Sequence, residues 1–342
     1  MELPERKKKI LHAVVESYIS SGEPIGSKAL MENCGLSVSS ATIRNELADL
    51  VTRGYLLQPH TSAGRVPSNK GYRYYIDNLM TKQPLSDRIK EHIEHAIITS
   101  ADAPEKILQK TAQVLSELSG MAAVTTTPNG DNARVHKIRF VITGRHTCMA
   151  VLITSNGMVK SRLFRCDFVL TPELVAMFDK ALNDSFVGVP LSEINQAFLQ
   201  TVAASFGELS LFMTDVLIAI LDACTQAMQT VVNISGSTNL LFLPNYDLMS
   251  ARNVLKFMSD SNALSKLLNE NMKGTKIYIG KESGSYELSD SCVLTTRYEI
   301  GGVSAGAIAL LGPVRADYKN LISLVEFASD CASGLIGQLL EV

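Results

Sequence analysis

One pattern near the N-terminus of this 342-residue chain restricts the possible folds most: three helix-like segments are followed at once by two short strand-like segments. Apolar residues recur at three- to four-residue spacing in the helical segments, and "SSGEPIGS" separates the first from the second. Gly35 fits the left-handed position that ends the second helix. The expected elements are helices at 6–20, at 28–33 and from Ser39 or Ser40 to Gly54, then strands at 55–58 and 65–68.

The third helix has two chemically different faces. Its apolar face, with Ile43, Leu47 and Leu50, should pack inward. The opposite face carries small and polar residues, namely Ala41, Asn45 and Ala48, with Thr42 and Arg44 on the flanks. Small residues allow close approach to another surface, and Asn and Arg can make paired hydrogen bonds to adenine and guanine edges. With the hairpin that follows, this arrangement predicts a winged helix-turn-helix.

The loop "PHTSAG" and the residues after it supply hydroxyl and cationic groups that suit phosphate oxygens or a minor groove. At least two of the three tyrosines at 72, 74 and 75 are expected to pack at a domain junction instead. The alternative is a solvated helix and hairpin that only pack against the rest, with Arg44 paired to Glu46 or Asp49. The predicted DNA-binding residues are Ser39, Ser40, Thr42, Arg44, Asn45, His60, Thr61, Arg65, Lys70 and Arg73.

The charge distribution supports an anionic partner for the N-terminal part. Residues 1–82 carry 11 Lys and Arg against 8 Asp and Glu, although the whole chain has a net charge of -2. The remainder is therefore acidic. Such asymmetry is a mild indication of nucleic-acid binding, since ordinary solvated surfaces can also produce it.

The rest of the chain alternates between strand-like and helical blocks. Strands are expected at "KIRFVIT", "CMAVLIT", "MVKSRLF", "NLLFLP", "TKIYIG", "CVLTTRYEIGG" and "VSAGAIALLGP", and a helix closes the chain. Helical patterns fill most of 172–232. The sequence therefore predicts an α+β multidomain protein with a DNA-binding domain at 1–82 and a linker helix at 83–104. One α+β domain should follow, made of 105–171 and 233–342 and interrupted by an insertion at 172–232.

Several other classes of protein are disfavoured by the sequence. The basic N-terminus runs into a helical pattern rather than an apolar leader, and the longest apolar run contains Asp215 and is too short for a bilayer, so a soluble, cytoplasmic protein without a membrane partner is expected. Six scattered cysteines without C-x-x-C argue for reduced, mostly buried thiols. His92 and His95 share a helix face, but two imidazoles make a poor metal site. We expect neither a metal nor a cofactor.

One catalytic motif occurs and is set aside. Residues 302–306, "GVSAG", match G-x-S-x-G, but a nucleophile elbow needs a helix after the serine. Here a β-like apolar run follows Ser304, so a turn between strands is expected. The sequence thus does not predict an enzyme.

The strings "GEPIGSKAL", "SSATIRNELADL", "QPHTSAGRVPSNKGYRYY" and "GGVSAGAIALLGPVRADYKNLISLVEF" resemble HrcA, the family of heat-inducible transcription repressors of bacteria. The resemblance extends over the whole chain; Ser68 stands where Thr is expected and keeps the hydroxyl. It implies a repressor of GroE- and DnaK-type chaperone operons that binds the inverted-repeat CIRCE operator as a homodimer. It also implies a GAF-like interrupted domain, an insertion that dimerises, and the chaperonin GroEL as folding partner.

Two modes of regulation remain open from the sequence. In the first, the repressor depends on chaperonin-assisted folding, because strands split by an insertion must make slow long-range pairings. In the second, a small metabolite binds the GAF-like domain and controls DNA binding. A thermal-shift screen with metabolites would separate the two.

Overall fold

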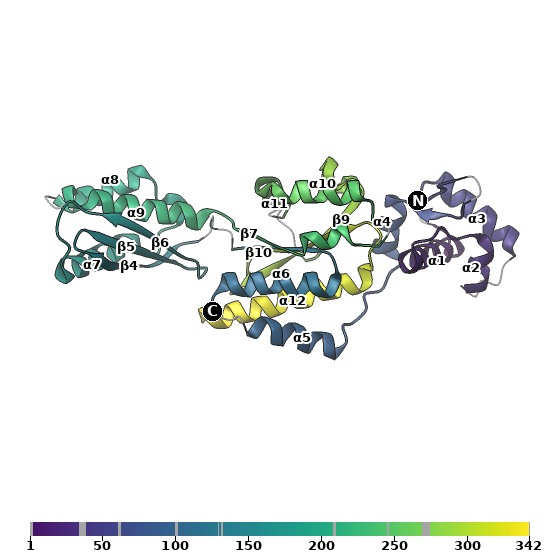
Figure 1. Cartoon of the computed structure of the whole chain (residues 1–342), viewed down its shortest axis with the longest axis horizontal. Coiled ribbons are helices and arrows are strands. Elements are labelled where there is room, and N and C mark those ends of the chain that lie inside the picture. Colours follow the sequence, from purple (N-terminus) through teal and green to yellow (C-terminus); the bar gives the residue numbers. More distant parts are fainter. Residues whose placement is uncertain are drawn as a thin grey trace.

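The computed structural model describes residues 3–33, 39–60, 63–99, 102–128, 130, 133–207, 210–244, 246–268 and 274–341. Three units lie in a row along the long axis of the molecule (Figure 1). The N-terminal unit is at one end, a five-stranded sheet with its helices is in the middle, and a three-stranded sheet with its helices is at the other end. Within the described residues, no helix is both long and apolar enough to cross a membrane.

The N-terminal unit follows the order expected from the sequence. Strands β1 and β2 pair antiparallel, with Leu56 opposite Pro67 and Leu57 opposite Val66, so the predicted hairpin forms. Gly35, expected to end the second helix, lies outside the described residues. The elements are α1 (Glu5–Ser21), α2 (Ser27–Asn33), α3 (Ser40–Thr52), β1 (Leu56–Leu57), β2 (Val66–Pro67) and α4 (Asn69–Asn78).

The middle unit is built on an antiparallel sheet with strand order β7-β3-β10-β9-β8. Successive residues of β9 face opposite sides: Cys292 and Leu294 pack toward α6 and α12, whereas Val293 packs toward α10 and α11. Helices therefore cover both faces (Figure 1). The elements are α5 (Asp87–Ile98), α6 (Pro104–Ser119), β3 (Ala122–Thr126), β7 (Val232–Ser235), α10 (Leu248–Ser259), α11 (Ser261–Leu268), β8 (Lys276–Ile279), β9 (Ser291–Ile300), β10 (Val303–Pro313) and α12 (Tyr318–Leu340).

The segment expected to be a linker helix, 83–104, contains α5. This helix buries Ile93 and Ile97 and packs against α6 and α12. It thus belongs to the helical layer of the middle unit.

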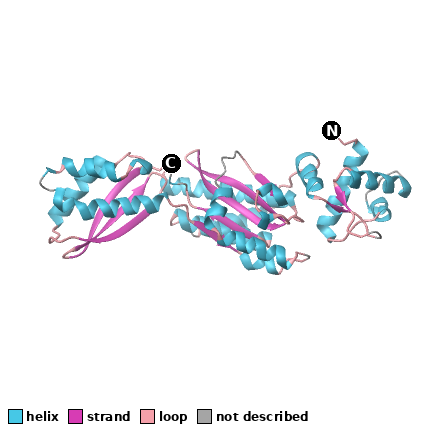
Figure 2. Ribbon diagram, turned by 90° about the horizontal axis from the view of Figure 1, so that it is seen from above, coloured by secondary structure: helices cyan, strands magenta, loops and turns pink. Residues whose placement is uncertain are grey.

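The third unit interrupts the middle sheet between β3 and β7, which pair directly through Thr126 and Val232. Its strands β4, β5 and β6 form a separate antiparallel sheet (Figure 2). Helices α7 and α9 pack on this sheet. The elements are β4 (Val135–Gly144), β5 (Thr147–Thr154), β6 (Val159–Arg165), α7 (Pro172–Phe186), α8 (Gln196–Ser205) and α9 (Ser210–Met228).

This arrangement corrects two expectations from the sequence. Placing 105–171 in one domain with 233–342 is wrong for β4, β5 and β6, because these strands share a core with α7 and α9 rather than with the five-stranded sheet. The run "NLLFLP" was expected to be a strand, but Ser237–Leu241 is a 3-10 helix. The strand beside β3 is instead β7, which lies at the edge of the sheet, and the segment after it turns into this 3-10 helix.

Other local expectations agree with the structure. Ser304 lies in β10, which continues as a strand after the Gly301–Gly302 turn, and its hydroxyl accepts a hydrogen bond from Arg297. No nucleophile elbow forms at this serine. Among the described cysteines four are buried and one is half-buried, and all are free thiols. Burial raises the pKa of Cys166 to about 11 and that of Cys224 to about 12.

Candidate nucleic-acid interface

Three of the predicted contact residues stand at the beginning of α3. The Ser39 hydroxyl accepts a hydrogen bond from the Thr42 backbone amide at 3.2 Å and so caps the helix. Ser39 Oγ also lies 3.0 Å from Thr42 Oγ1, and Ser40 Oγ lies 3.2 Å from Ser27 Oγ on α2. These hydroxyls therefore fix where α3 begins and how it meets α2, and their contact with DNA stays a prediction.

The outer face of α3 presents Arg44 and Asn45. Both side chains are exposed, and so are the small residues Ala41 and Ala48 beside them. Ile43 on the inner face is fully buried. Within the described part of the chain, neither Arg44 nor Asn45 makes a side-chain hydrogen bond or an ion pair. The two side chains predicted to read base edges are thus accessible.

The acidic neighbours of Arg44 are occupied elsewhere. Glu46 is buried and pairs with Arg6 and Lys7 of α1, and Asp49 pairs with Lys7 and with Arg53. The hydrogen bond from Lys7 lowers the pKa of Glu46 below its usual 4.5; burial acts the other way, and Arg6 adds to the lowering. The alternative in which Arg44 pairs with Glu46 or Asp49 is therefore not what the structure adopts.

The loop of the hairpin is only partly described. His60 is exposed, and Thr61 lies outside the described residues. Arg65 is half-buried: its backbone forms a two-way pair with Ile25, and its side chain donates to the Ala63 carbonyl at 3.2 Å. A Cβ on Gly64 would come within 2.5 Å of the Ile25 backbone, so this glycine permits the close approach. Arg65 thus contributes to the base of the hairpin, and only part of its side chain can reach a ligand.

Lys70 has a structural contact as well. Its Nζ donates to the Arg53 carbonyl, just past the end of α3, at 2.9 Å and lies 4.4 Å from the centre of the Tyr55 ring. A cation at this end interacts favourably with the helix dipole. The side chain remains exposed, so a phosphate could still approach it.

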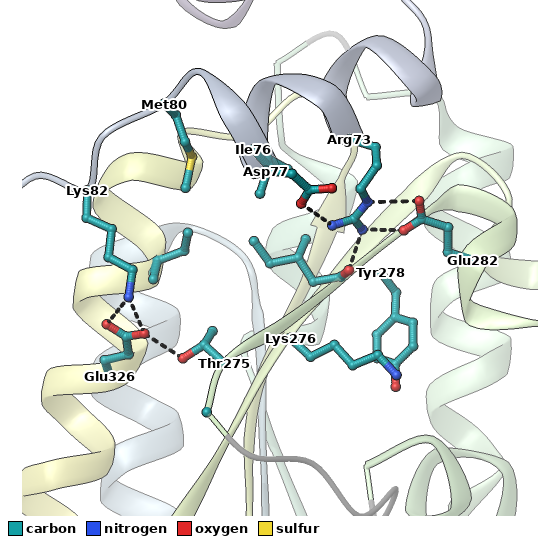
Figure 3. A pocket seen from close by; sticks show the side chains of 13 residues that line it. Arg73, Ile76, Asp77, Met80, Lys82, Thr275, Lys276, Tyr278, Glu282 and Glu326 are labelled. Atoms are coloured by element: carbon teal, nitrogen blue, oxygen red, sulfur yellow. Dashed lines mark hydrogen bonds and ion pairs between the residues drawn. The ribbon is translucent and has the colours of Figure 1, made fainter. Parts of the chain in front are cut away.

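Arg73 has partners in the middle unit, and its contact with DNA stays a prediction. Its guanidinium donates to both carboxylate oxygens of Glu282, to Asp77 and to the Ile277 carbonyl (Figure 3). These partners, apart from Asp77, belong to β8 and the turn after it. In this conformation Arg73 joins the N-terminal unit to the middle unit and is not part of the α3 face.

The tyrosine expectation is confirmed for Tyr72. Tyr72 is 3% exposed and packs edge-on against Tyr318 of α12, with 6.0 Å between ring centroids. Tyr75 is 1% exposed and bonds through its hydroxyl to Glu16, which pairs with Lys319 of α12. Tyr72 thus packs at the junction between units, whereas Tyr75 packs on α1 of its own unit and is linked to α12 only through Glu16.

Two acidic residues at the junction carry no signal in the sequence. Glu282 and Glu326 pair with Arg73 and Lys82 respectively, across more than 200 residues of chain. No local pattern marks either carboxylate. Within the described ranges, no cluster of three or more His, Cys, Asp or Glu could hold a metal ion.

Comparison with known proteins assigns the chain to a family. Residues 105–322 match the family model described as the HrcA protein C terminal domain. The chain belongs to the HrcA family. The family comprises transcription repressors, and the protein is not an enzyme.

Relatives in the HrcA family match along nearly the full chain. The "Heat-inducible transcription repressor HrcA" of Acetivibrio thermocellus is 32% identical over 96% of this chain and 94% of its own length. The protein of the same name from Lysinibacillus sphaericus is 33% identical, covering 95% of each chain. A crystal structure described as a hypothetical protein at 2.2 Å resolution shares the fold, with a TM-score of 0.65 and 24% identity over 99% of this chain and 100% of that one.

Proposed function

We propose that this protein is a winged-helix transcription repressor that binds a double-stranded operator through the outer face of α3. The observation that carries the proposal is the exposed, unpaired Arg44 and Asn45 on α3, in a chain of the HrcA family. A helix with such a face, preceded by a short turn and followed by a hairpin, suits insertion into a major groove. The repressed genes would be chaperone operons of the GroE and DnaK type.

The test is operator binding by alanine variants of the α3 face. Arg44→Ala and Asn45→Ala should each weaken binding to the specific operator by about 1–3 kcal/mol, the worth of one paired base contact. Binding to unrelated DNA should change less. Arg88→Ala on α5 is a matched control, since Arg88 is also an exposed helical arginine but lies on the middle unit. Normal repression by both α3 variants would refute the proposed reading face.

A homodimer is part of the proposal, because one winged helix reads one half-site and an inverted repeat has two. The resemblance implies that the inserted segment dimerises, and helical patterns fill most of this segment. However, Phe178, Leu182, Val216 and Ile220 of those helices are buried against β4, β5 and β6 of the same chain. The helical block therefore buries an apolar face against its own sheet, although Met177 and Ile218 remain exposed.

The other face of that sheet is the better candidate for the interface. Cys148, Ala150 and Leu152 of β5 point to the helices, so the alternate residues point away from them. On this open face Val141, Met149 and Leu163 form one row across the three strands. Val141 is 46% exposed and Leu163 is 67% exposed. We propose that two copies associate through this face of the inserted unit.

Regulation by chaperonin-assisted folding is supported by the order in which the sheet must assemble. Strand β3 pairs with β7 and with β10, so residues about a hundred or more positions apart must meet before the middle sheet can form. Such topologies fold slowly and expose apolar surface meanwhile. We therefore propose that GroEL maintains the active fraction, in the cytoplasm where the operator lies.

The measurement is operator binding after refolding, alone and with GroEL, its co-chaperonin and ATP. The active fraction should rise with the chaperonin, while the affinity of each active dimer stays constant. Full spontaneous activity would favour the metabolite alternative.

A further inference from the structure

The N-terminal unit is attached to the middle unit by an ion-pair network rather than by a loose tether. Arg73 on α4 makes hydrogen bonds to Glu282, including one of 3.0 Å from Nε to Oε1, and also donates to the Ile277 carbonyl. Burial alone would raise the pKa of Glu282, but the bonds from Arg73 and from the Ile279 amide lower it. Glu282 is therefore a charged partner at neutral pH, held in place by the end of β8.

Further contacts anchor other parts of the N-terminal unit. Lys319 of α12 pairs with Glu16 of α1 at 2.6 Å. Arg315 donates to the Ile19 carbonyl at 3.0 Å through one nitrogen and to the Pro244 carbonyl at 3.1 Å through the other. The unit is thus held through α1 as well as through α4, which restricts its tilt and its rotation relative to the middle sheet.

The segment that leaves α4 is fixed too. Lys82 pairs with Glu326 of α12 at 2.7 Å, and Glu326 also accepts a hydrogen bond from Thr275 (Figure 3). The Gln83 carbonyl accepts a hydrogen bond of 2.6 Å from the Ser323 hydroxyl. A tether bonded in this way cannot act as a free hinge.

A cavity of about 740 Å³ lies between α4 and β8, and the network lines it. Four of the charged side chains on its walls form pairs between the units: Arg73 with Glu282 and Lys82 with Glu326 (Figure 3). The polar groups of these four side chains are therefore occupied in joining two units. We interpret this cavity as the boundary between the N-terminal unit and the middle unit, which are held rigidly together.

Orientation matters because of how a dimer reads DNA. In a two-fold dimer the separation of the two recognition helices must match the half-site separation, about one helical turn or a multiple of it. That separation depends on how each N-terminal unit is fixed to the body that carries the interface. A flexible joint would accept several half-site spacings, and a rigid joint accepts few.

We infer that Arg73 and Glu282 are positioning residues that set the spacing between operator half-sites which the dimer accepts. The inference rests on the proposed function as a dimeric operator-binding repressor. Neither residue belongs to the α3 face, so neither is needed for contact within one half-site. Loss of the Arg73–Glu282 pair should therefore change the discrimination between operators of different half-site spacing more than it changes the affinity for a single half-site.

The experiment measures binding to the inverted-repeat operator and to versions whose central spacer is changed by one, two and five base pairs. Wild-type protein should lose about tenfold or more in affinity on the altered spacers, equivalent to about 1.4 kcal/mol. Arg73→Ala and Glu282→Gln should each lose about threefold or less, and their binding to an isolated half-site should equal that of wild type. Arg88→Ala should discriminate as wild type does.

A charge exchange separates positioning from a general loss of stability. Arg73→Glu combined with Glu282→Arg restores a pair of opposite charges, and Glu282→Arg also supplies a cation for Asp77, which pairs with Arg73 in the wild-type protein. The double variant should regain at least part of the spacer discrimination that each single variant lacks. If Arg73→Ala and Glu282→Gln discriminate between spacers as well as wild type, the inference is overturned and the proposed function stands. If wild-type protein does not bind the inverted repeat at all, both are overturned.

Discussion

Lys7 of α1 lies 2.7 Å from a carboxylate oxygen of Glu46, and this ion pair fastens the first helix to the inner side of α3. The carboxylate is 7% exposed and also pairs with Arg6. Removing one partner of a buried ion pair leaves the remaining charges without an opposite charge nearby. Glu46→Ala should lower the free energy of unfolding by about 1–3 kcal/mol. Urea denaturation checks this, and Glu5→Ala, which removes a 79% exposed partner of Lys8, should cost about 0.5 kcal/mol or less.

Acid should weaken the same helix contact. The Glu46 pKa is lowered from 4.5 in the folded protein, chiefly by the Lys7 hydrogen bond, so the unfolded chain binds a proton more readily. The stabilisation is therefore complete above about pH 4.5 and is lost as the pH falls through the lower, folded pKa. Thermal unfolding between about pH 5 and pH 3 should show a falling midpoint in wild type and a smaller fall in Glu46→Gln. Equal slopes in the two proteins would contradict the assignment.

Tyr72 carries a hydroxyl that the fold does not use. The ring is buried against Tyr318, and within the described residues its hydroxyl oxygen has no hydrogen-bond partner. Burying an unpaired polar group costs free energy. Tyr72→Phe should therefore leave stability unchanged or raise it by about 1 kcal/mol, whereas Tyr72→Ala should lower it by about 3–5 kcal/mol. A clear loss of stability in Tyr72→Phe would show that the hydroxyl has a partner.

The salt dependence of operator binding distinguishes basic residues that contact phosphate from basic residues that only join the two units. Removing a cation that contacts phosphate lowers the slope of log affinity against log salt by roughly one. Lys70→Ala should show this decrease if its exposed ammonium reaches the backbone. Arg73→Ala should leave the slope unchanged, because its guanidinium bonds to Glu282 and faces away from α3. A decrease in Arg73→Ala would mean that the junction opens on DNA.

Local features of the fold could be predicted from the sequence. The helices of the N-terminal unit and the β1–β2 hairpin follow from apolar periodicity and turn residues, which act over a few positions. Strands β8, β9 and β10 were equally visible as apolar runs between turns. The exposed positions of Arg44 and Asn45 follow from the same helical spacing as the buried Ile43.

The features that the sequence did not predict depend on contacts between residues far apart in the chain. Which sheet β4, β5 and β6 join is decided by the pairing of Thr126 with Val232 across the insertion, and no local signal records it. The contact of Arg73 with Glu282 could not be predicted for the same reason, since Glu282 lies 209 residues further along the chain. A basic residue near a recognition helix looks the same in sequence whether it binds a phosphate or a carboxylate.

The proposed dimer interface makes the sharpest prediction about the inserted unit. Leu163 is 67% exposed at the centre of β6, on the face of the sheet that α7 and α9 leave open. In an isologous interface each substitution acts twice, once on each copy. Leu163→Glu should raise the dimer dissociation constant about tenfold or more, since it removes apolar burial and adds a charge on both sides.

Sedimentation equilibrium measures this dissociation constant, and Val303→Glu, at a 61% exposed valine of the middle sheet, is the control. The Leu163→Glu monomer should still bind a single half-site, because α3 lies on another unit. A dimer of undiminished strength would move the interface away from the open sheet face.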